Sequence, residues 1–452
     1  MIRVLCRVPR ASRPWQFIVH RSAFIVLLLA LPTSLFAAEP ALEPATLAPP
    51  EEQISAKPAW VEKLGLGGFI RSDYYSASKR LDGQKSLPGI TFQPKALPKF
   101  GSWGDAKIEG RITDDNLRRD NRFQGRLLEA YANFYLGSVD LRVGKQNIVW
   151  GRADALNPTD VLTPKDFTLL SAKDEEERRI GTYAVKANYY RGDYTLSLMW
   201  LPVFNPTTIP LTSPPGFRLI EEKRSSGKWT DQGFAAKLDH TGGELDWSLS
   251  YYYGLDLFPV GMPVTPTLTQ LVHNRIQMVG ADVARNFGRF GVRGEAAYVR
   301  TQDPDGRDPF IKNPYVYYVL GVDHDLTEDL NVNVQAYQRI IINFQDLFQI
   351  QDPVARNVAT LNAIFNQQLD RVQEGVTGRI KATAWNKTLE AELLGVWNAN
   401  RSDFFVRPSM AYAFTDRWKG FIGWDIYNGR KQSLNGFFQP NTAFFAELRA
   451  TF

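Results

Sequence analysis

The residues of this chain that could do chemistry are mainly charged and polar side chains at every second position. Around residue 334, Val332 and Val334 alternate with Asn333, Gln335 and, further on, Arg339. Successive side chains of a β-strand point to opposite faces, so such a segment has one apolar and one polar face. A water-filled channel tolerates charges on the polar face, whereas a packed core does not. The pattern therefore predicts contact with solutes in water rather than covalent catalysis.

The polar faces of the predicted strands supply the candidate pore-lining residues. These are Arg71, Asp73, Glu129, Arg142, Asp282, Arg293, Glu295, Asp323, Arg339, Arg379, Lys381 and Arg407. Basic and acidic residues are nearly balanced over the polar faces as a whole, which argues against strong selectivity for anions or cations. Ion pairs across the lumen with a purely structural role are the alternative for any one of these residues.

The chain offers little for catalysis. After the leader it has only His240, His273 and His324, which fall at separate turns and loops. Its single cysteine, Cys6, lies in the leader, so a thiol nucleophile or a cysteine metal site is excluded. No phosphate-binding loop, dinucleotide fingerprint or metal-ligand cluster occurs. We predict no catalytic residue, no cofactor and no metal; a hydrolase that uses carboxylates alone at a pore mouth is the remaining enzymatic alternative.

The N-terminal segment has the composition of a secretory leader. Residues 1–37 combine five arginines, a short apolar run and small residues at the end, which predicts a cleaved signal peptide. The formal net charge of +5 comes from those arginines, so it is no argument for nucleic-acid binding. Residues 38–59 are rich in Pro, Ala and Glu and predict a disordered periplasmic tether. Residues 60–452 are then one all-β domain.

The segments with alternating apolar and polar side chains are about ten residues long. The connections between them are short and long in turn. Both features are typical of a transmembrane antiparallel up-and-down β-barrel with short periplasmic turns and long outer loops. We predict about sixteen strands, with eighteen as the alternative, and place residues 77–123 in a long first loop with 100–112 as a possible additional strand. The predicted strands are residues 62–76, 124–136, 139–149, 180–190, 194–203, 232–240, 244–254, 275–286, 290–301, 313–324, 329–340, 373–385, 388–397, 404–414, 417–427 and 441–452.

The chain ends on an alternating strand whose last residue is Phe452. This end resembles the C-terminal strand signal recognised by the outer-membrane barrel assembly machinery. Together with the leader, it predicts a bacterial outer-membrane location after signal-peptide cleavage, with membrane lipids and lipopolysaccharide as surroundings.

The segment VGKQNIVWGRADALNPTDVLTPKDF, which begins within the strand predicted at 139–149, resembles a motif of outer-membrane porin-like barrels related to alginate-export barrels. The resemblance rests on Gly144, Lys145, Gln146, Trp150, Gly151, Asn157, Pro158 and Asp160. It implies a class of barrel and no particular substrate. The loop that follows, 151–179, either folds inward to narrow the pore or lies outside; the constriction candidates are Trp150, Arg152, Asn157 and Asp160. The charge run 174–179 is either solvated or lines the mouth.

A second long connection, 341–372, predicts an amphipathic helix with Asp352 as N-cap and Pro353 in its first turn. It either packs on other loops or dips into the lumen. Loop 255–273 is also apolar, and two apolar loops suggest a hydrophobic or amphiphilic solute. We expect a porin-like outer-membrane channel for small or amphiphilic molecules. The alternatives are an export pore for a polysaccharide or lipid, and a plugged structural or adhesin barrel.

Overall fold

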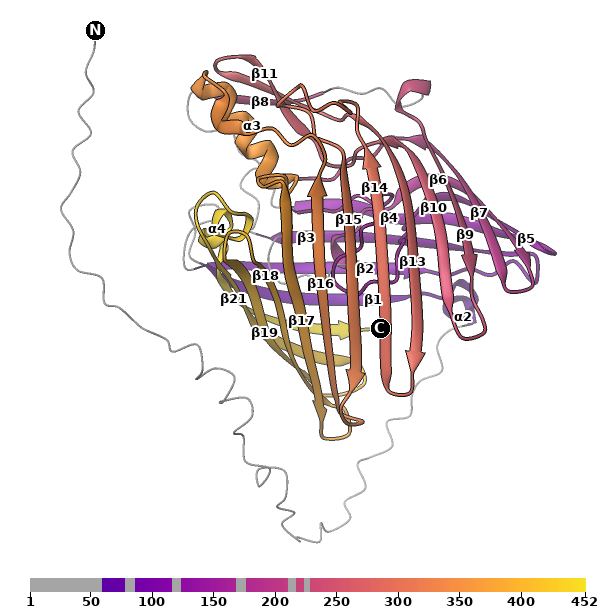
Figure 1. The fold of residues 1–452 in the computed structure, drawn as a ribbon. Coiled ribbons are helices and arrows are strands. Elements are labelled where there is room, and N and C mark those ends of the chain that lie inside the picture. Colours follow the sequence, from indigo (N-terminus) through magenta and orange to yellow (C-terminus); the bar gives the residue numbers. More distant parts are fainter. Residues whose placement is uncertain (1–58, 78–85, 116–122, 168–175, 210–216, 223–227) are drawn as a thin grey trace, which may run out of the picture. The chain divides into compact units, whose positions relative to one another are not determined.

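The computed structural model of the chain describes residues 59–77, 86–115, 123–167, 176–209, 217–222 and 228–452 (Figure 1). The predicted signal peptide and the predicted tether, except for Ala59, lie outside the described residues. So do parts of loops 77–123 and 151–179.

Eighteen antiparallel strands form one sheet. They are β1 (Gly67–Ala77), β2 (Ser86–Ala96), β3 (Gly104–Asp115), β4 (Phe123–Leu136), β5 (Val139–Gln146), β6 (Thr182–Arg191), β7 (Tyr194–Val203), β9 (Gly233–His240), β10 (Asp246–Leu255), β13 (Arg275–Phe287), β14 (Phe290–Arg300), β15 (Tyr315–Asp325), β16 (Leu330–Ile341), β17 (Val372–Ala384), β18 (Leu389–Asn398), β19 (Asp403–Ala413), β20 (Trp418–Asn428) and β21 (Ala443–Thr451). A small second sheet is formed by β8 (Arg218–Glu221), β11 (Val260–Thr265) and β12 (Leu268–Val272).

The large sheet closes on itself as an up-and-down barrel. Each strand pairs with its neighbours in chain order, and β1 pairs with β21 from Phe69 opposite Thr451 to Ala77 opposite Ala443. Turns such as Gly137-Ser138 and Gly288-Arg289 lie at one end of the barrel, and the long connections lie at the other, as the sequence predicts. In Figure 1, α3, β8 and β11 lie at the long-loop end and the β13–β14 turn at the opposite end.

The preferred count of sixteen strands is wrong, and the alternative of eighteen is confirmed. All sixteen predicted strands are present, but the predicted loop 77–123 contains β2 and β3 as a further hairpin of the barrel. Strand β2 carries Pro88 and Pro94, and a proline cannot donate to a ladder, so its sequence argues against a strand. The structure accommodates Pro94 because β2 pairs continuously with β1, whereas its ladder with β3 skips Gln93 and Pro94.

Smaller boundaries also differ. The first strand begins at Gly67 rather than at residue 62, because residues 59–64 form the short helix α2 (Ala59–Leu64). The last turn of this helix closes when the Gly65 N–H donates to the Glu62 carbonyl, with Gly65 at φ +54°.

The two faces of the wall follow the predicted alternation. Large apolar side chains that are exposed cover the outside, among them Leu320 and Val334, whereas Asn333 and Gln335 are buried inside. The aromatic residues at strand ends Trp200, Tyr298, Tyr412, Phe414, Trp418 and Trp424 are all exposed. The outer face therefore has the chemistry of a surface that meets lipid.

Helices are short and lie in the connections. Helix α3 (Pro353–Phe365) confirms the predicted loop helix: the Asp352 carboxylate accepts hydrogen bonds from the N–H groups of Val354 and Ala355 at 2.7 and 2.9 Å. It packs on other loops, since Asn362 bonds the backbone of Gly261. The remaining helical turns are α4 (Leu434–Phe437), η2 (Glu176–Arg178), η3 (Trp229–Asp231), η4 (Leu347–Gln349) and η5 (Gln439–Asn441). Within the described ranges, no helix has the length and apolarity to span a membrane.

The assignment of faces predicts a difference between two arginine substitutions. We expect Val334→Arg to reduce the yield of folded barrel in lipid vesicles strongly, because an arginine on the lipid face near the midplane costs about 2–4 kcal/mol. The control is Ser409→Arg, on an inward position that pairs in register with Glu392. Heat-modifiable gel mobility measures both yields; equal yields mean that the faces are assigned wrongly.

Candidate functional site

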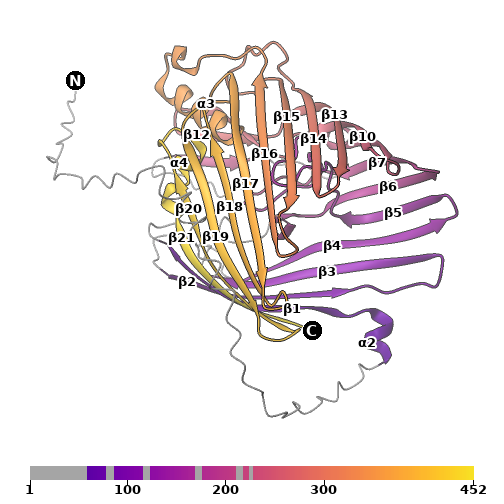
Figure 2. The same cartoon turned by 60° about the horizontal axis from the view of Figure 1, so that its bottom comes forward.

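The chain leaves the wall after β5 and enters the barrel. Strand β5 ends at Gln146, three residues before the predicted end. Beyond Gln146 the backbone N–H groups donate to side-chain oxygens instead of to the backbone of a neighbouring strand. The Asn147 N–H donates to Glu129 (2.8 Å) and the Ile148 N–H donates to the Thr163 hydroxyl (2.9 Å). We call residues 147–167 the lumen loop, because its partners are inward-facing residues of the wall. Figure 2 shows its coil enclosed by the strands.

An apolar core fastens the lumen loop to one side of the barrel. Ile148, Trp150 and Leu162 are buried in a cluster with inward-facing residues of β6 to β16. Those wall residues are Ala184, Met199, Leu201, Ala235, Tyr252, Ile276, Met278, Ala297, Val299, Tyr315, Tyr317, Val319, Tyr337 and Ile341. Trp150, a predicted constriction residue, is only 3% exposed and is one of the three buried apolar residues that attach the loop to the wall.

Glu295 of β14 binds the tip of the lumen loop. Its carboxylate accepts hydrogen bonds from the Thr159 N–H (2.7 Å), the Thr159 hydroxyl (2.8 Å) and the Ala153 N–H (3.2 Å). Gly151, at φ +91°, lies against the same carboxylate, and a Cβ at that position would overlap both carboxylate oxygens. A single buried acid therefore organises the turn from residue 151 to residue 159.

Charged contacts extend from this turn to neighbouring strands. Arg152 pairs with Asp282 of β13 and, at 3.4 Å, with Asp239 of β9. Asp154 accepts from Arg293 of β14 (2.5 Å) and Asn333 of β16 (2.6 Å). These contacts reach four strands, β9, β13, β14 and β16, within a run of six neighbouring strands, so the loop tip is bound along a wide arc of wall.

The second half of the lumen loop is held by a separate set of ion pairs. Asp160 pairs with Arg179 (2.9 Å) and Lys165 (3.6 Å), and Asp166 pairs with Arg126 of β4 (2.7 Å). Asn157, another predicted constriction residue, donates to the Ala153 carbonyl (2.8 Å). Arg152 thus contacts the wall, whereas Asn157 bonds within the lumen loop, and Asp160 pairs with Lys165 of the loop and with Arg179 beyond its end.

The arc from β17 to β21 is not covered by this loop. A hollow of about 560 Å³ lies there, lined by Phe421, Phe445 and charged residues of these strands. Several of these charges are paired: Glu390 with Lys381 (3.2 Å) and Lys419 (2.7 Å), and Arg407 with Asp425 (2.5 Å). Its charged residues are Lys381, Glu390, Glu392, Arg407, Asp416, Arg417, Lys419, Glu447 and Arg449.

The other predicted pore-lining residues are spread around the wall. Glu129 pairs with Lys107, and Arg142 donates to Asn133 at 2.7 Å. Asp323 pairs with Arg293 at 3.0 Å. Arg339 lies over the rings of Tyr315 and Tyr317, donating to the Asn366 carbonyl, and Arg379 has a buried Nε without a hydrogen-bond partner in the described part of the chain. The predicted set is therefore distributed over several networks rather than one site.

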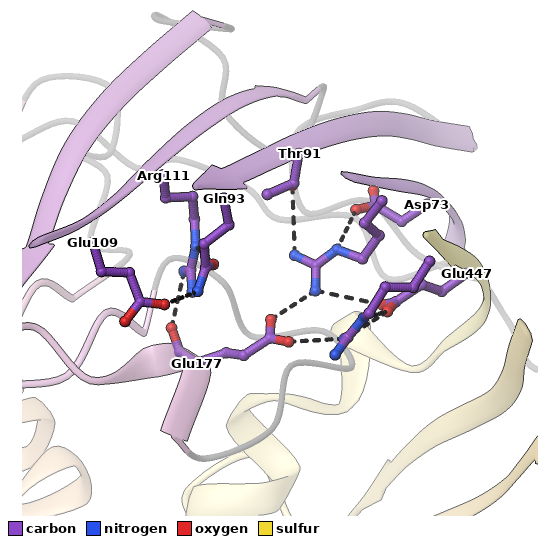
Figure 3. Close-up of polar contacts among 9 residues, drawn as sticks. Asp73, Thr91, Gln93, Glu109, Arg111, Glu177 and Glu447 are labelled. Carbon is purple, nitrogen blue, oxygen red and sulfur yellow. Dashed lines mark hydrogen bonds and ion pairs between the residues drawn. The ribbon is translucent and has the colours of Figure 1, made fainter. Parts of the chain in front are cut away.

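One cluster escaped sequence reasoning (Figure 3). Glu177, in the turn η2, lies between Arg71 of β1, at 2.7 Å, and Arg449 of β21, at 2.9 Å. Arg111 of β3 donates to the Glu177 backbone carbonyl at 2.9 Å. The sequence showed Glu177 only as part of a charge run. Among the described residues, no group of three or more His, Cys, Asp or Glu could hold a metal ion.

Comparison with known proteins supports the fold. Neither a scan with protein-family models nor a search of curated protein sequences finds a match. Solved structures with a similar fold include OccK5 (OpdH) of Pseudomonas aeruginosa, with 10% sequence identity and a TM-score of 0.51, covering 86% of this chain and 96% of that one. OpdQ of the same organism has 12% sequence identity and a TM-score of 0.50; the aligned region covers 86% of this chain and 98% of the OpdQ chain. The chain is thus a closed porin-like β-barrel.

The bonds to Glu295 predict a local effect of its charge. We expect Glu295→Gln to speed hydrogen exchange at the backbone amides of Ala153 and Thr159. The glutamine side chain replaces one accepting carboxylate oxygen with an NH₂ group, which cannot accept a hydrogen bond from these N–H groups. A lost charge-assisted bond of this kind costs about 1–3 kcal/mol. The control, Glu390→Gln, removes an acid from the hollow and leaves these amides unchanged. Unaltered exchange in Glu295→Gln shows that Glu295 does not hold the loop.

Proposed function

We propose that this chain is a channel of the bacterial outer membrane through which small or amphiphilic molecules pass, with the lumen loop as its constriction. The single observation that carries the proposal is the position of that loop. It is bonded to inward-facing residues from β9 to β16, while the arc from β17 to β21 keeps a charged hollow. A closed sheet of this size encloses more space than wall side chains alone fill.

The outer face supports a membrane location. Lipid cannot hydrogen-bond to a backbone, so a spanning sheet must close, and this one does. Exposed apolar residues such as Leu320 and Val334 then contact lipid, and the lipopolysaccharide of the outer membrane surrounds the long-loop end. The leader predicted at 1–37 fits export to that membrane.

The charges inside support weak selectivity. Lys381, Lys419 and Arg407 each have an acidic partner, so the hollow carries paired charges of both signs. Its aromatic residues, Phe421 and Phe445, give it apolar surface as well. A lining of this kind suits a solute with polar and apolar parts.

Two alternatives remain distinct from this proposal. The first is an export pore for a polysaccharide or lipid; the motif between Gly144 and Asp160, which resembles that of barrels related to alginate export, is compatible with it but implies no particular substrate. The second is a plugged structural or adhesin barrel, in which the lumen loop would close the pore rather than narrow it. Conductance separates the plugged barrel from both channels, because a plugged barrel passes no steady current.

The lumen loop should therefore control conductance. We expect a larger single-channel current in planar bilayers when residues 153–176 are replaced by a short Gly-Ser linker, because the part bonded to Glu295, Arg293 and Gln335 is removed. Asp305→Ala, at an exposed site in a rim loop, is the control and leaves the current unchanged. If the loop variant conducts no better than the parent, the constriction lies elsewhere.

The last residue tests the proposed partnership with the barrel assembly machinery. Phe452 stacks on Phe92 at 5.8 Å, and its N–H donates to the Gly68 carbonyl. We expect Phe452→Ala to lower the amount of heat-modifiable barrel in cells more than its refolding yield in detergent, because only cells use the machinery. Thr451→Ala is the control. Equal losses in cells and detergent would show that Phe452 serves packing alone.

A further inference from the structure

The seam that closes the barrel brings like charges together. In the register of β1 with β21, Arg71 lies directly opposite Arg449, and Asp73 lies directly opposite Glu447. Like charges directly opposite each other in an antiparallel pair are destabilising. Each arginine has an acid two residues away in its own strand, at 3.3 Å for Arg71–Asp73 and 2.7 Å for Arg449–Glu447.

The two arginines share one further acid, and it comes from outside the wall. One carboxylate oxygen of Glu177 lies 2.7 Å from Arg71 and the other lies 2.9 Å from Arg449. By comparison, the wall acid Glu447 lies 3.6 Å from Arg71, too far for a strong hydrogen bond. Glu177 is therefore the carboxylate that bridges the two guanidinium groups across the seam, as Figure 3 shows.

The wall holds these guanidinium groups in place. The Arg71 side chain is 1% exposed, and its Nη2 lies 3.5 Å from the Thr91 hydroxyl. Both arginines lie over the ring of Phe69, Arg71 at 5.6 Å and Arg449 at 4.7 Å. The donors thus belong to the barrel, whereas the acceptor between them belongs to an inserted turn.

We propose that Arg71 and Arg449 form a binding site for a single carboxylate group in the lumen wall, and that Glu177 is its built-in occupant. Hydrogen bonds from a guanidinium group to a carboxylate are charge-assisted and stronger than neutral ones, and here each carboxylate oxygen accepts one, from a different arginine. Arg449 also lines the hollow beside β17 to β21, so the site adjoins open lumen. The assignment concerns the folded barrel alone and does not rest on the proposed function.

Chemical rescue tests this site. Glu177→Ala removes the bridging carboxylate, so we expect the barrel in detergent micelles to lose its heat-modifiable mobility at a lower temperature than the parent. Sodium formate should restore at least half of that loss, whereas sodium chloride at the same ionic strength should restore less. The matched control is Glu176→Ala, at an exposed neighbour on the same turn, which leaves the unfolding temperature unchanged with either salt.

A second variant keeps the test decisive if Glu177→Ala folds poorly. Removing one arginine from the unbridged pair relieves the repulsion, so Glu177→Ala combined with Arg449→Gln should fold in higher yield and unfold at a higher temperature than Glu177→Ala alone. The proposal is overturned if Glu177→Ala is as stable as the parent, if formate acts no better than chloride, or if the second substitution brings no recovery. None of these readouts requires solute passage, so a barrel that fails to conduct can still pass them.

Discussion

Pairing of β1 with β21 is the interaction on which the other features depend, since it joins the two ends of the described domain and leaves no strand of the large sheet with a free edge. In a membrane this closure is obligatory, because unpaired backbone groups find no partner in lipid. Closure also creates the one place where strands distant in sequence must match their charges. Arg71 meets Arg449 there, and the barrel accommodates the pair with an acid that neither strand supplies.

A barrel of eighteen strands has more interior than its own side chains fill, and the lumen loop occupies part of it. The loop is bound in two chemically different ways. Trp150 and Leu162 bury apolar surface against the inner face of strands β6 to β16. Glu295 accepts hydrogen bonds from backbone N–H groups that burial would otherwise leave without partners. The apolar contacts give adhesion, whereas the Glu295 bonds define where the turn lies.

The inner wall of the barrel has two parts, which differ in what its charged residues pair with. On the side bound by the loop, Asp282, Arg293 and Glu295 are used to hold protein. On the side of the hollow, Lys381, Arg407 and Lys419 are paired within the wall and remain next to open space. A residue that faces inward is therefore not always a residue that a solute can reach, and the candidate pore-lining set contains both kinds.

The sequence alone determined the strands whose side chains alternate and the helix capped by Asp352, because both signals are local. It also indicated the barrel class from strand length and turn spacing. It did not determine the number of strands, since Pro88 and Pro94 disguise β2, and their effect depends on which neighbour each backbone group faces. Nor did it place the loop. Glu295 lies 142 residues from Ala153 in the chain, and Glu177 lies 272 residues from Arg449. Contacts at such separations leave no periodic trace in a sequence, because they exist only after the closed wall has brought the partners within hydrogen-bonding distance.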